Sequence, residues 1–143
     1  MRVFLVMIAL GFSVMLQAQK VEVENTIKQF FTGFHAKDTV KIKSICDETM
    51  MLQSILENKT ESKLKQEKST DFFKSIAKIP NEVRFEEKIL SYKIKIDGAM
   101  AHAWTPYEFY LNGKLSHKGV NSFTLFKTAQ GWKIVHIIDT RRK

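Results

Sequence analysis

Four polar side chains in the C-terminal half have the types and spacing to form a binding or acid–base site. Tyr107, Lys118, Asp139 and Arg141 lie in a stretch rich in apolar and aromatic residues. A guanidinium group binds an anion through two parallel hydrogen bonds, and a phenol adds one donor. Asp139 is the candidate general acid or base, because burial raises the pKa of a carboxyl group. Since Lys118 and Arg141 would stabilise the charged carboxylate, this group of residues favours ligand binding over proton abstraction.

Three turn signals in residues 83–141 predict the antiparallel strands that position these side chains. Asp97-Gly98 and Asn112-Gly113 are typical of two-residue hairpin turns, and residues 128–131 predict a looser turn. Successive side chains of a strand point to opposite faces, so each turn also predicts which residues share a face. The expected pairs next to the turns are Ile96 with Ala99, Leu111 with Lys114, and Lys127 with Trp132.

The first predicted face is apolar at one end and polar at the other, which is typical of a pocket with a mouth. Tyr107 is expected opposite Lys118, and Lys118 opposite Arg141. Such a site suits a partly apolar small molecule with an anionic or strongly hydrogen-bonding head. The alternative is a salt bridge between Asp139 and Arg141 at the rim, without a ligand. The predicted ligand-binding residues are Phe30, Phe34, Thr105, Tyr107, Phe109, Lys118, Ser122, Asp139 and Arg141.

The second predicted face is too aromatic to be exposed to water as one patch, but it also carries lysines and histidines. This mixture favours a homodimer interface on the outer face of the sheet. A bulge at the third turn would exchange the faces of the last strand and remove Asp139 and Arg141 from the pocket. The predicted interface residues are His102, Trp104, Asn121, Phe123, Trp132 and His136.

The segment before these strands has helical periodicity. Val23, Ile27, Phe30, Phe31 and Phe34 form one apolar stripe, which predicts an amphipathic helix. The elements expected after it are a short helix capped by Asp38, a strand at 50–56, a loop or weak hairpin at 57–68, a helix capped by Ser69 or Thr70, and a strand with a bulge between Ile89 and Leu90.

The first 18 residues differ from the rest of the chain. Arg2 precedes an apolar run, and Gln17-Ala18-Gln19 follows it. This pattern predicts a cleavable export signal at 1–18, with Ala18 as its last residue, and an uncleaved membrane anchor is the alternative. We therefore expect one domain at 19–143, located in the periplasm or outside the cell, without stable membrane insertion after cleavage. A lone cysteine, Cys46, permits no internal disulfide.

The formal net charge of +8 comes from basic residues scattered among acids, without a basic stripe. Nucleic acid is therefore not expected as a partner. His35, His102, His117 and His136 are too widely spaced to predict a metal site. The sequence has no glycine-rich phosphate loop and no nucleophile-elbow motif, so no cofactor is predicted either.

Element order and several local strings resemble the nuclear transport factor 2-like superfamily, also called the cystatin-like α+β cone, over residues 20–141. The likeness is greatest to small exported bacterial members of unknown function. The strings are Phe30-Phe31, Met51-Leu52-Gln53-Ser54, the 104–110 segment WTPYEFY, the 117–121 segment HKGVN, and Gly131-Trp132-Lys133-Ile134 before Asp139-Thr140-Arg141-Arg142. The resemblance implies an α+β fold with a strongly bent antiparallel sheet around N-terminal helices, a conical pocket, and a dimer through the outer face.

The superfamily includes steroid isomerases, polyketide cyclases, dehydratases and noncatalytic binding or assembly modules. The isomerase branch places a proton-donating acid where this chain has Ser122, and a tyrosine where it has Phe30, Phe31 or Phe34. Isomerase chemistry is therefore disfavoured. The main hypothesis is an exported binding domain for a small ligand. The alternatives are a cofactor-free isomerase, cyclase or dehydratase that uses Asp139 as acid or base, and a dimeric assembly module.

Overall fold

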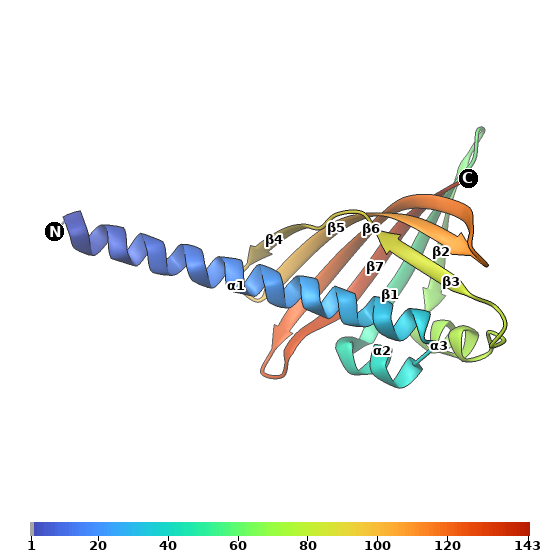
Figure 1. The fold of residues 1–143 in the computed structure, drawn as a ribbon, viewed down its shortest axis with the longest axis horizontal. Coiled ribbons are helices and arrows are strands. Elements are labelled where there is room, and N and C mark those ends of the chain that lie inside the picture. The colour runs from blue at the N-terminus through green and yellow to red at the C-terminus, as the bar shows by residue number, and fades with distance from the viewer. Residues whose placement is uncertain (1) are drawn as a thin grey trace.

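A long N-terminal helix, α1 (Arg2–His35), projects beyond the rest of the molecule (Figure 1). The computed structural model describes the backbone of residues 2–143 and the side chains of residues 15–143. Most side chains of the predicted export signal therefore lie outside the described residues. Among the described residues, no helix combines the length and the apolar character needed to span a membrane.

The sheet curves around the C-terminal half of α1 (Figure 1). Its strand order is β2-β1-β7-β6-β5-β3, with β4 also paired to β5, and only β1 and β7 run parallel among the described strands. The predicted α+β class with N-terminal helices is confirmed, in a sheet that is mixed at this one pair. The remaining elements are α2 (Thr39–Ile45), β1 (Cys46–Glu57), β2 (Ser62–Lys68), α3 (Ser69–Ala77), β3 (Phe85–Ile89), β4 (Lys93–Asp97), β5 (Met100–Leu111), β6 (Lys114–Thr128) and β7 (Gly131–Arg142).

The helices follow their local signals, with one difference in capping. Asp38 caps α2 as predicted, because its Oδ1 accepts the Lys41 N–H at 2.9 Å. The cap predicted for α3 is wrong, because Lys68 occupies the N-cap position and makes no side-chain bond there. The apolar stripe of α1 packs against the sheet, and Val23 and Ile27 are fully buried.

The bulge predicted after Ile89 and the hairpin turn predicted at Asn112-Gly113 are both present. Ile89 pairs with Tyr107, but Lys93 pairs with Trp104, so one extra residue lies between β3 and β4. This one-residue shift of register, within residues 90–92, is what the predicted bulge requires. In the β5–β6 turn, Asn112 and Gly113 both have positive φ, 49° and 78°, as in the predicted turn type.

The β4–β5 turn differs by one step from the prediction. Asp97 pairs with Met100, so the loop is Gly98-Ala99, and only its first residue, Gly98, has a positive φ, of 57°. Ile96 consequently pairs with Ala101 instead of Ala99. This shift is an even number of residues, so the predicted faces of β4 and β5 are unchanged.

A bulge near Ser116 reverses the predicted faces of β6. Tyr110 pairs with Leu115, but Phe109 pairs with His117, which leaves Ser116 as the extra residue. From there on the odd-numbered residues of β6 face the helices, and Asn121, Phe123 and Leu125 are buried. Tyr107 therefore lies opposite Gly119, and the predicted pairing with Lys118 is wrong.

A second bulge, at Val135, exchanges the faces to which the side chains of β7 point before and after it. Leu125 pairs with Ile134, but Thr124 pairs with His136. Before this bulge, Trp132 and Ile134 pair with Lys127 and Leu125 of the reversed β6, so they face the helices and are 4% and 0% exposed. The outer position predicted for Trp132 is therefore wrong. Beyond the bulge, Asp139 and Arg141 also lie on the concave face of the sheet, although the alternation assumed for the whole of β7 was wrong.

Candidate functional site

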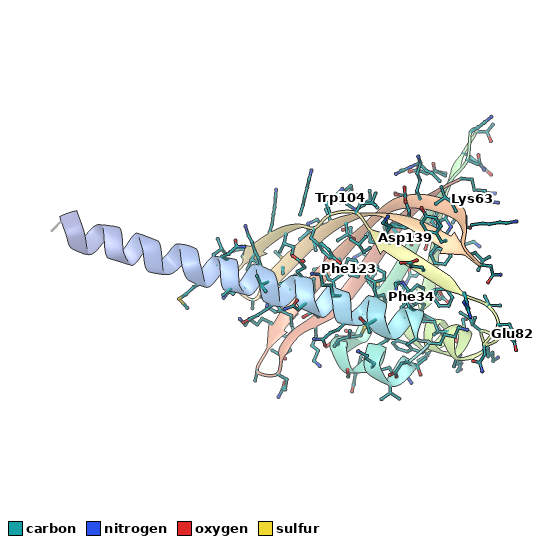
Figure 2. The ribbon with its side chains drawn as sticks, viewed as in Figure 1. Phe34, Lys63, Glu82, Trp104, Phe123 and Asp139 are labelled. Atoms are coloured by element: carbon teal, nitrogen blue, oxygen red, sulfur yellow. The ribbon has the colours of Figure 1, made fainter. Side chains whose placement is uncertain are left out.

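A cavity of about 210 Å³ lies between α1, α3 and the concave face of the sheet. Figure 2 shows Phe34 on α1 beside the sheet that carries Phe123 and Asp139. The lining combines aromatic and aliphatic side chains with a smaller polar group: Phe30, Phe31, Phe34, Leu52, Phe72, Phe109, Phe123 and Ile137, then Glu87, Tyr107, His117, Asn121, Asp139 and Arg141.

The apolar wall is a cluster of phenylalanines from three elements. The ring of Phe30 is nearly parallel to those of Phe34 and Phe72, at centroid distances of 6.1 and 6.3 Å. Phe123 of β6 meets Phe30 edge to face at 6.0 Å. Phe30 and Phe34 are one helical turn apart, so they present both rings to the same cavity. This wall suits a flat apolar group.

The polar side chains of the cavity converge on Asp139. Its carboxylate accepts hydrogen bonds from the Ser54 hydroxyl at 2.5 Å and from the Tyr107 phenol at 3.1 Å. Arg141 donates to the same carboxylate from Nε at 2.7 Å and from a terminal nitrogen at 3.4 Å. The Tyr107 hydroxyl also lies 2.9 Å from the Thr140 carbonyl oxygen. Burial, followed by the negative charges of Asp139 and Glu87, raises the pKa of Tyr107, so the phenol remains a donor.

The close approach of Thr140 requires Gly119. A Cβ atom at Gly119 would lie 1.7 Å from the Thr140 carbonyl oxygen. The side chain of Thr140 also accepts the Val120 N–H at 3.1 Å. The absence of a side chain at Gly119 therefore lets the carbonyl that Tyr107 contacts come close to β6.

Glu87 is a carboxyl group of the cavity with a raised pKa. It shares the inward phase of β3 with Phe85 and Ile89. The Asn121 amide donates to Glu87 Oε1 at 2.6 Å. Burial raises the pKa of Glu87 to about 7, the charge of Asp139 adds to this rise, and the bond from Asn121 and the charge of Arg141 oppose it. Glu87 can therefore exchange a proton near neutral pH.

Two histidines border the polar group, and burial lowers the pKa of both. His35 Nε2 accepts the backbone N–H of Glu87 at 2.9 Å, which requires the neutral imidazole and fixes the edge strand at Glu87. The negative charge of Glu86 opposes the lowering of the His35 pKa. His117 stacks on Phe109 with a centroid distance of 4.8 Å, and the charge of Arg141 further lowers its pKa.

The structure brings six of the nine predicted ligand-binding residues together at the cavity: Phe30, Phe34, Tyr107, Phe109, Asp139 and Arg141. Thr105 is fully buried beside them, and its hydroxyl donates to the Asn121 carbonyl at 3.4 Å. Lys118 and Ser122 lie on the convex face, because the Ser116 bulge reverses this part of β6. Lys118 pairs there with Glu108, and Ser122 contacts His102.

Three of the six predicted interface residues are misplaced for the same reason. Asn121 and Phe123 line the cavity, and Trp132 belongs to the core. His102, Trp104 and His136 lie on the convex face, where Trp104 is 45% exposed (Figure 2).

Sequence reasoning missed Glu87, Asn121 and His117 as cavity residues. Glu87 could have been found from its spacing, because it is the acid between Phe85 and Ile89 on the same face of β3. In β6, the larger apolar side chains at Phe123 and Leu125 were a signal that odd-numbered residues face inward.

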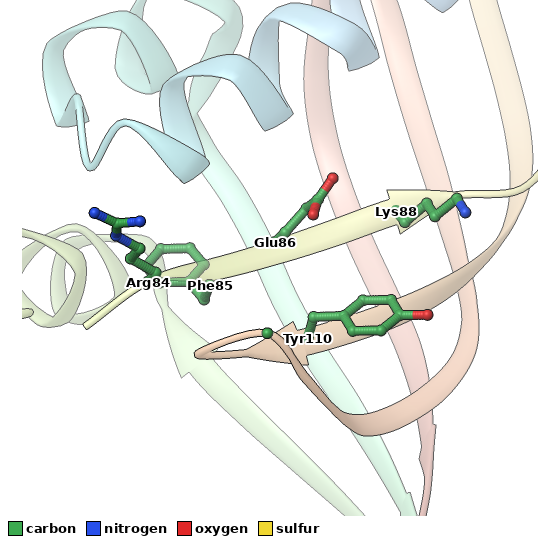
Figure 3. A pocket seen from close by; sticks show the side chains of 6 residues that line it. Arg84, Phe85, Glu86, Lys88 and Tyr110 are labelled. Atoms are coloured by element: carbon green, nitrogen blue, oxygen red, sulfur yellow. The ribbon is translucent and has the colours of Figure 1, made fainter. Parts of the chain in front are cut away.

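A wider depression of about 580 Å³ lies between β3 and the β5–β6 turn (Figure 3). Arg84, Glu86 and Lys88 line it with exposed charged side chains, and Tyr110 donates its hydroxyl hydrogen to Glu108 at 2.8 Å. It is more open than the phenylalanine-lined cavity, which is therefore the better candidate for a ligand site. Among the described residues, no group of three His, Cys, Asp or Glu side chains is arranged to hold a metal ion.

Comparison with solved structures decides the fold. A Mycobacterium tuberculosis protein of unknown function has a TM-score of 0.75 at 10% identity, over 92% of this chain and 76% of that one. A nuclear transport factor 2-like protein with a cystatin-like fold from Novosphingobium aromaticivorans has a TM-score of 0.70 at 13% identity, over 92% and 87% of the two chains. The chain has the nuclear transport factor 2-like fold.

A candidate dehydratase of the nuclear transport factor 2-like family from Streptomyces avermitilis has a TM-score of 0.66 at 11% identity, over 89% of this chain and 98% of that one. No protein-family profile matches the sequence, and no curated protein sequence matches it. At these identities the likeness shows the nuclear transport factor 2-like fold and not an activity, since this fold carries unrelated functions.

Proposed function

We propose that the chain binds a small molecule built on a single ring, with the ring in the phenylalanine-lined cavity. The observation that carries this proposal is a cavity of about 210 Å³ with an aromatic wall on one side and Glu87, Asp139 and Arg141 on the other. An apolar cavity of about 150 Å³ takes up benzene. The larger volume here suits one ring with a short polar substituent.

The polar side offers both donors and acceptors to that substituent. A guanidinium group has five N–H groups, and Arg141 directs two of its nitrogens at Asp139. Its remaining N–H groups bond to no other residue whose side chain the structure describes, so they can contact a ligand. Glu87, with a pKa of about 7, can donate when protonated and accept when ionised. A carbonyl or hydroxyl group on the ligand fits either state.

Glu87 also supports a second candidate function, a cofactor-free proton-transfer enzyme of the isomerase, cyclase or dehydratase kind. A carboxyl group with a pKa near 7 inside an apolar cavity is suited to general acid–base catalysis. Asp139, the candidate from the sequence, already accepts four hydrogen bonds. Glu87 accepts one side-chain bond, from Asn121, and is therefore the better acid or base.

Native mass spectrometry of the protein purified from its host's cell envelope tests ligand binding. We expect a retained small molecule, and we expect Phe34→Trp to displace it, because the larger side chain fills space beside Phe30 and Phe72. Trp104→Phe, on the convex face, is the control and should retain the molecule. The proposal fails if the wild-type protein carries nothing and no single-ring compound raises its melting temperature. Turnover of a bound compound that Glu87→Gln abolishes, without loss of binding, would favour the enzyme.

The convex face and the N-terminus carry two further proposals, a homodimer and an exported protein. Met100, Trp104 and Phe126 are 55%, 45% and 49% exposed, and Met100 pairs with Phe126 on adjacent strands. Such a patch suits a contact with a second copy. Trp104→Glu should convert a dimer to a folded monomer in analytical ultracentrifugation, and an unchanged dimer contradicts this interface.

N-terminal sequencing of the protein from its host should begin at Gln19 if residues 1–18 are a cleaved signal.

A further inference from the structure

The concave face continues beyond the cavity onto the β1–β2 hairpin. Every residue of β2 is exposed, and the hairpin extends away from the helices (Figure 1). A second hollow of about 420 Å³ lies there. Five residues line both this groove and the cavity, so the two spaces adjoin: Leu52, Phe72, Ile137, Asp139 and Arg141.

Strand register places a second cation across the groove from Arg141. Ser54 of β1 pairs with Asp139 of β7 on one side and with Lys65 of β2 on the other. Neighbouring strands are about 4.8 Å apart, so the backbones of β2 and β7 are separated by about 10 Å. Lys65 and Arg141 both have long side chains, and both line the groove. Their charged ends can therefore reach one group bound above Ser54.

The two cations differ in how they are held. Asp139 fixes Arg141 through two hydrogen bonds, which orients its remaining N–H groups before a ligand arrives. Lys65 forms no ion pair within the described part of the chain, so its ammonium group is free to move toward an anion. Glu67 is the acid on the same side of β2 and also lines the groove. The negative charge of Glu67 weakens the attraction between Lys65 and an anion.

We propose that this groove is an anion subsite, in which Lys65 and Arg141 together bind the carboxylate of a ligand whose ring occupies the cavity. The proposal rests on the proposed function and extends it to a ligand class, an aryl carboxylic acid with a short linker. A charge-assisted hydrogen bond from each cation satisfies the two carboxylate oxygens. The aromatic wall of the cavity supplies affinity for the ring, and the groove supplies selectivity for the charged head.

A matched pair of probes, 3-phenylpropionate and 3-phenyl-1-propanol, separates the subsite from the cavity. Both probes carry the same ring and linker, and they differ in the charge of the head group. We expect isothermal titration calorimetry to show tighter binding of the acid by wild-type protein. Lys65→Gln should weaken binding of 3-phenylpropionate about threefold, the effect of one partly solvated ion pair, and leave the affinity for the alcohol unchanged. Glu67→Gln should strengthen binding of 3-phenylpropionate.

Lys118→Gln is the control, because it makes the same charge change on the convex face opposite Glu108. Equal weakening of the acid by Lys65→Gln and Lys118→Gln would reduce the effect to general electrostatic attraction and overturn the subsite. Binding of the alcohol without preference for the acid would also overturn the subsite and leave the proposed cavity function standing. Failure of both probes to bind would overturn the subsite, whereas the cavity function is decided separately by the mass-spectrometry and melting-temperature tests described above.

Discussion

Replacing Glu87 with glutamine should stabilise the protein at neutral and alkaline pH. Wild-type Glu87 must ionise inside the cavity, where burial raises its pKa from 4.5 to about 7. Glutamine removes this cost and keeps an oxygen that can accept the bond now donated by Asn121. The substitution therefore isolates the ionisation of one side chain.

The size and sign of the effect follow from proton linkage. Between pH 4.5 and about 7 the folded state binds this proton more strongly than the unfolded state does, so wild-type stability falls as pH rises through that window. The full pKa difference corresponds to about 3 kcal/mol, at about 1.4 kcal/mol per pH unit. Because Glu87 retains some contact with solvent, we expect Glu87→Gln to gain about 1–3 kcal/mol over wild type above pH 7, and this advantage to disappear near pH 4.5.

Urea denaturation followed by circular dichroism at pH values from 4.5 to 8 measures this difference. The quantity to compare is the free energy of unfolding of Glu87→Gln minus that of wild type at each pH. Glu82→Gln, in the exposed loop before β3, is the control and should differ from wild type by the same amount at every pH. A pH-independent difference for Glu87→Gln, or a loss of stability at pH 8, would refute the assignment of Glu87 as a carboxyl group with a raised pKa.

Two further substitutions test the supports of the site. Gly119→Ala should destabilise the fold by about 3 kcal/mol or more, seen as a lower urea midpoint, because its Cβ would collide with the Thr140 backbone; a midpoint equal to wild type would contradict this packing. His35 has a lowered pKa, so its contribution to stability is lost as pH falls below its ordinary 6.5. His35→Gln should reduce the loss of stability between pH 6.5 and 5, and an unchanged pH profile would show that the bond from Glu87 is unimportant.

The sequence predicted several features that depend mainly on neighbouring residues, although the N-cap of α3 and the exact β4–β5 turn differed from the prediction. Asp38 caps α2 through a bond three residues away, and Asn112-Gly113 forms the predicted turn because both residues tolerate a positive φ. The apolar stripe of α1 is likewise set by helical periodicity. These signals determined the order of the elements and the α+β class. They also identified two members of the aromatic wall, Phe30 and Phe34, because these residues lie on one helical face.

Only the tertiary structure decided which side chains of β6 and β7 face the cavity. The bulges at Ser116 and Val135 each add one residue to a strand, and each exchanges the two faces from that point onward. A bulge is stabilised by the partner strand and by the core it fills, so the local sequence does not specify it uniquely. The pKa of Glu87 has the same origin. Its rise depends on burial and on Asp139, which is distant in sequence and is brought near Glu87 by folding of the sheet around α1.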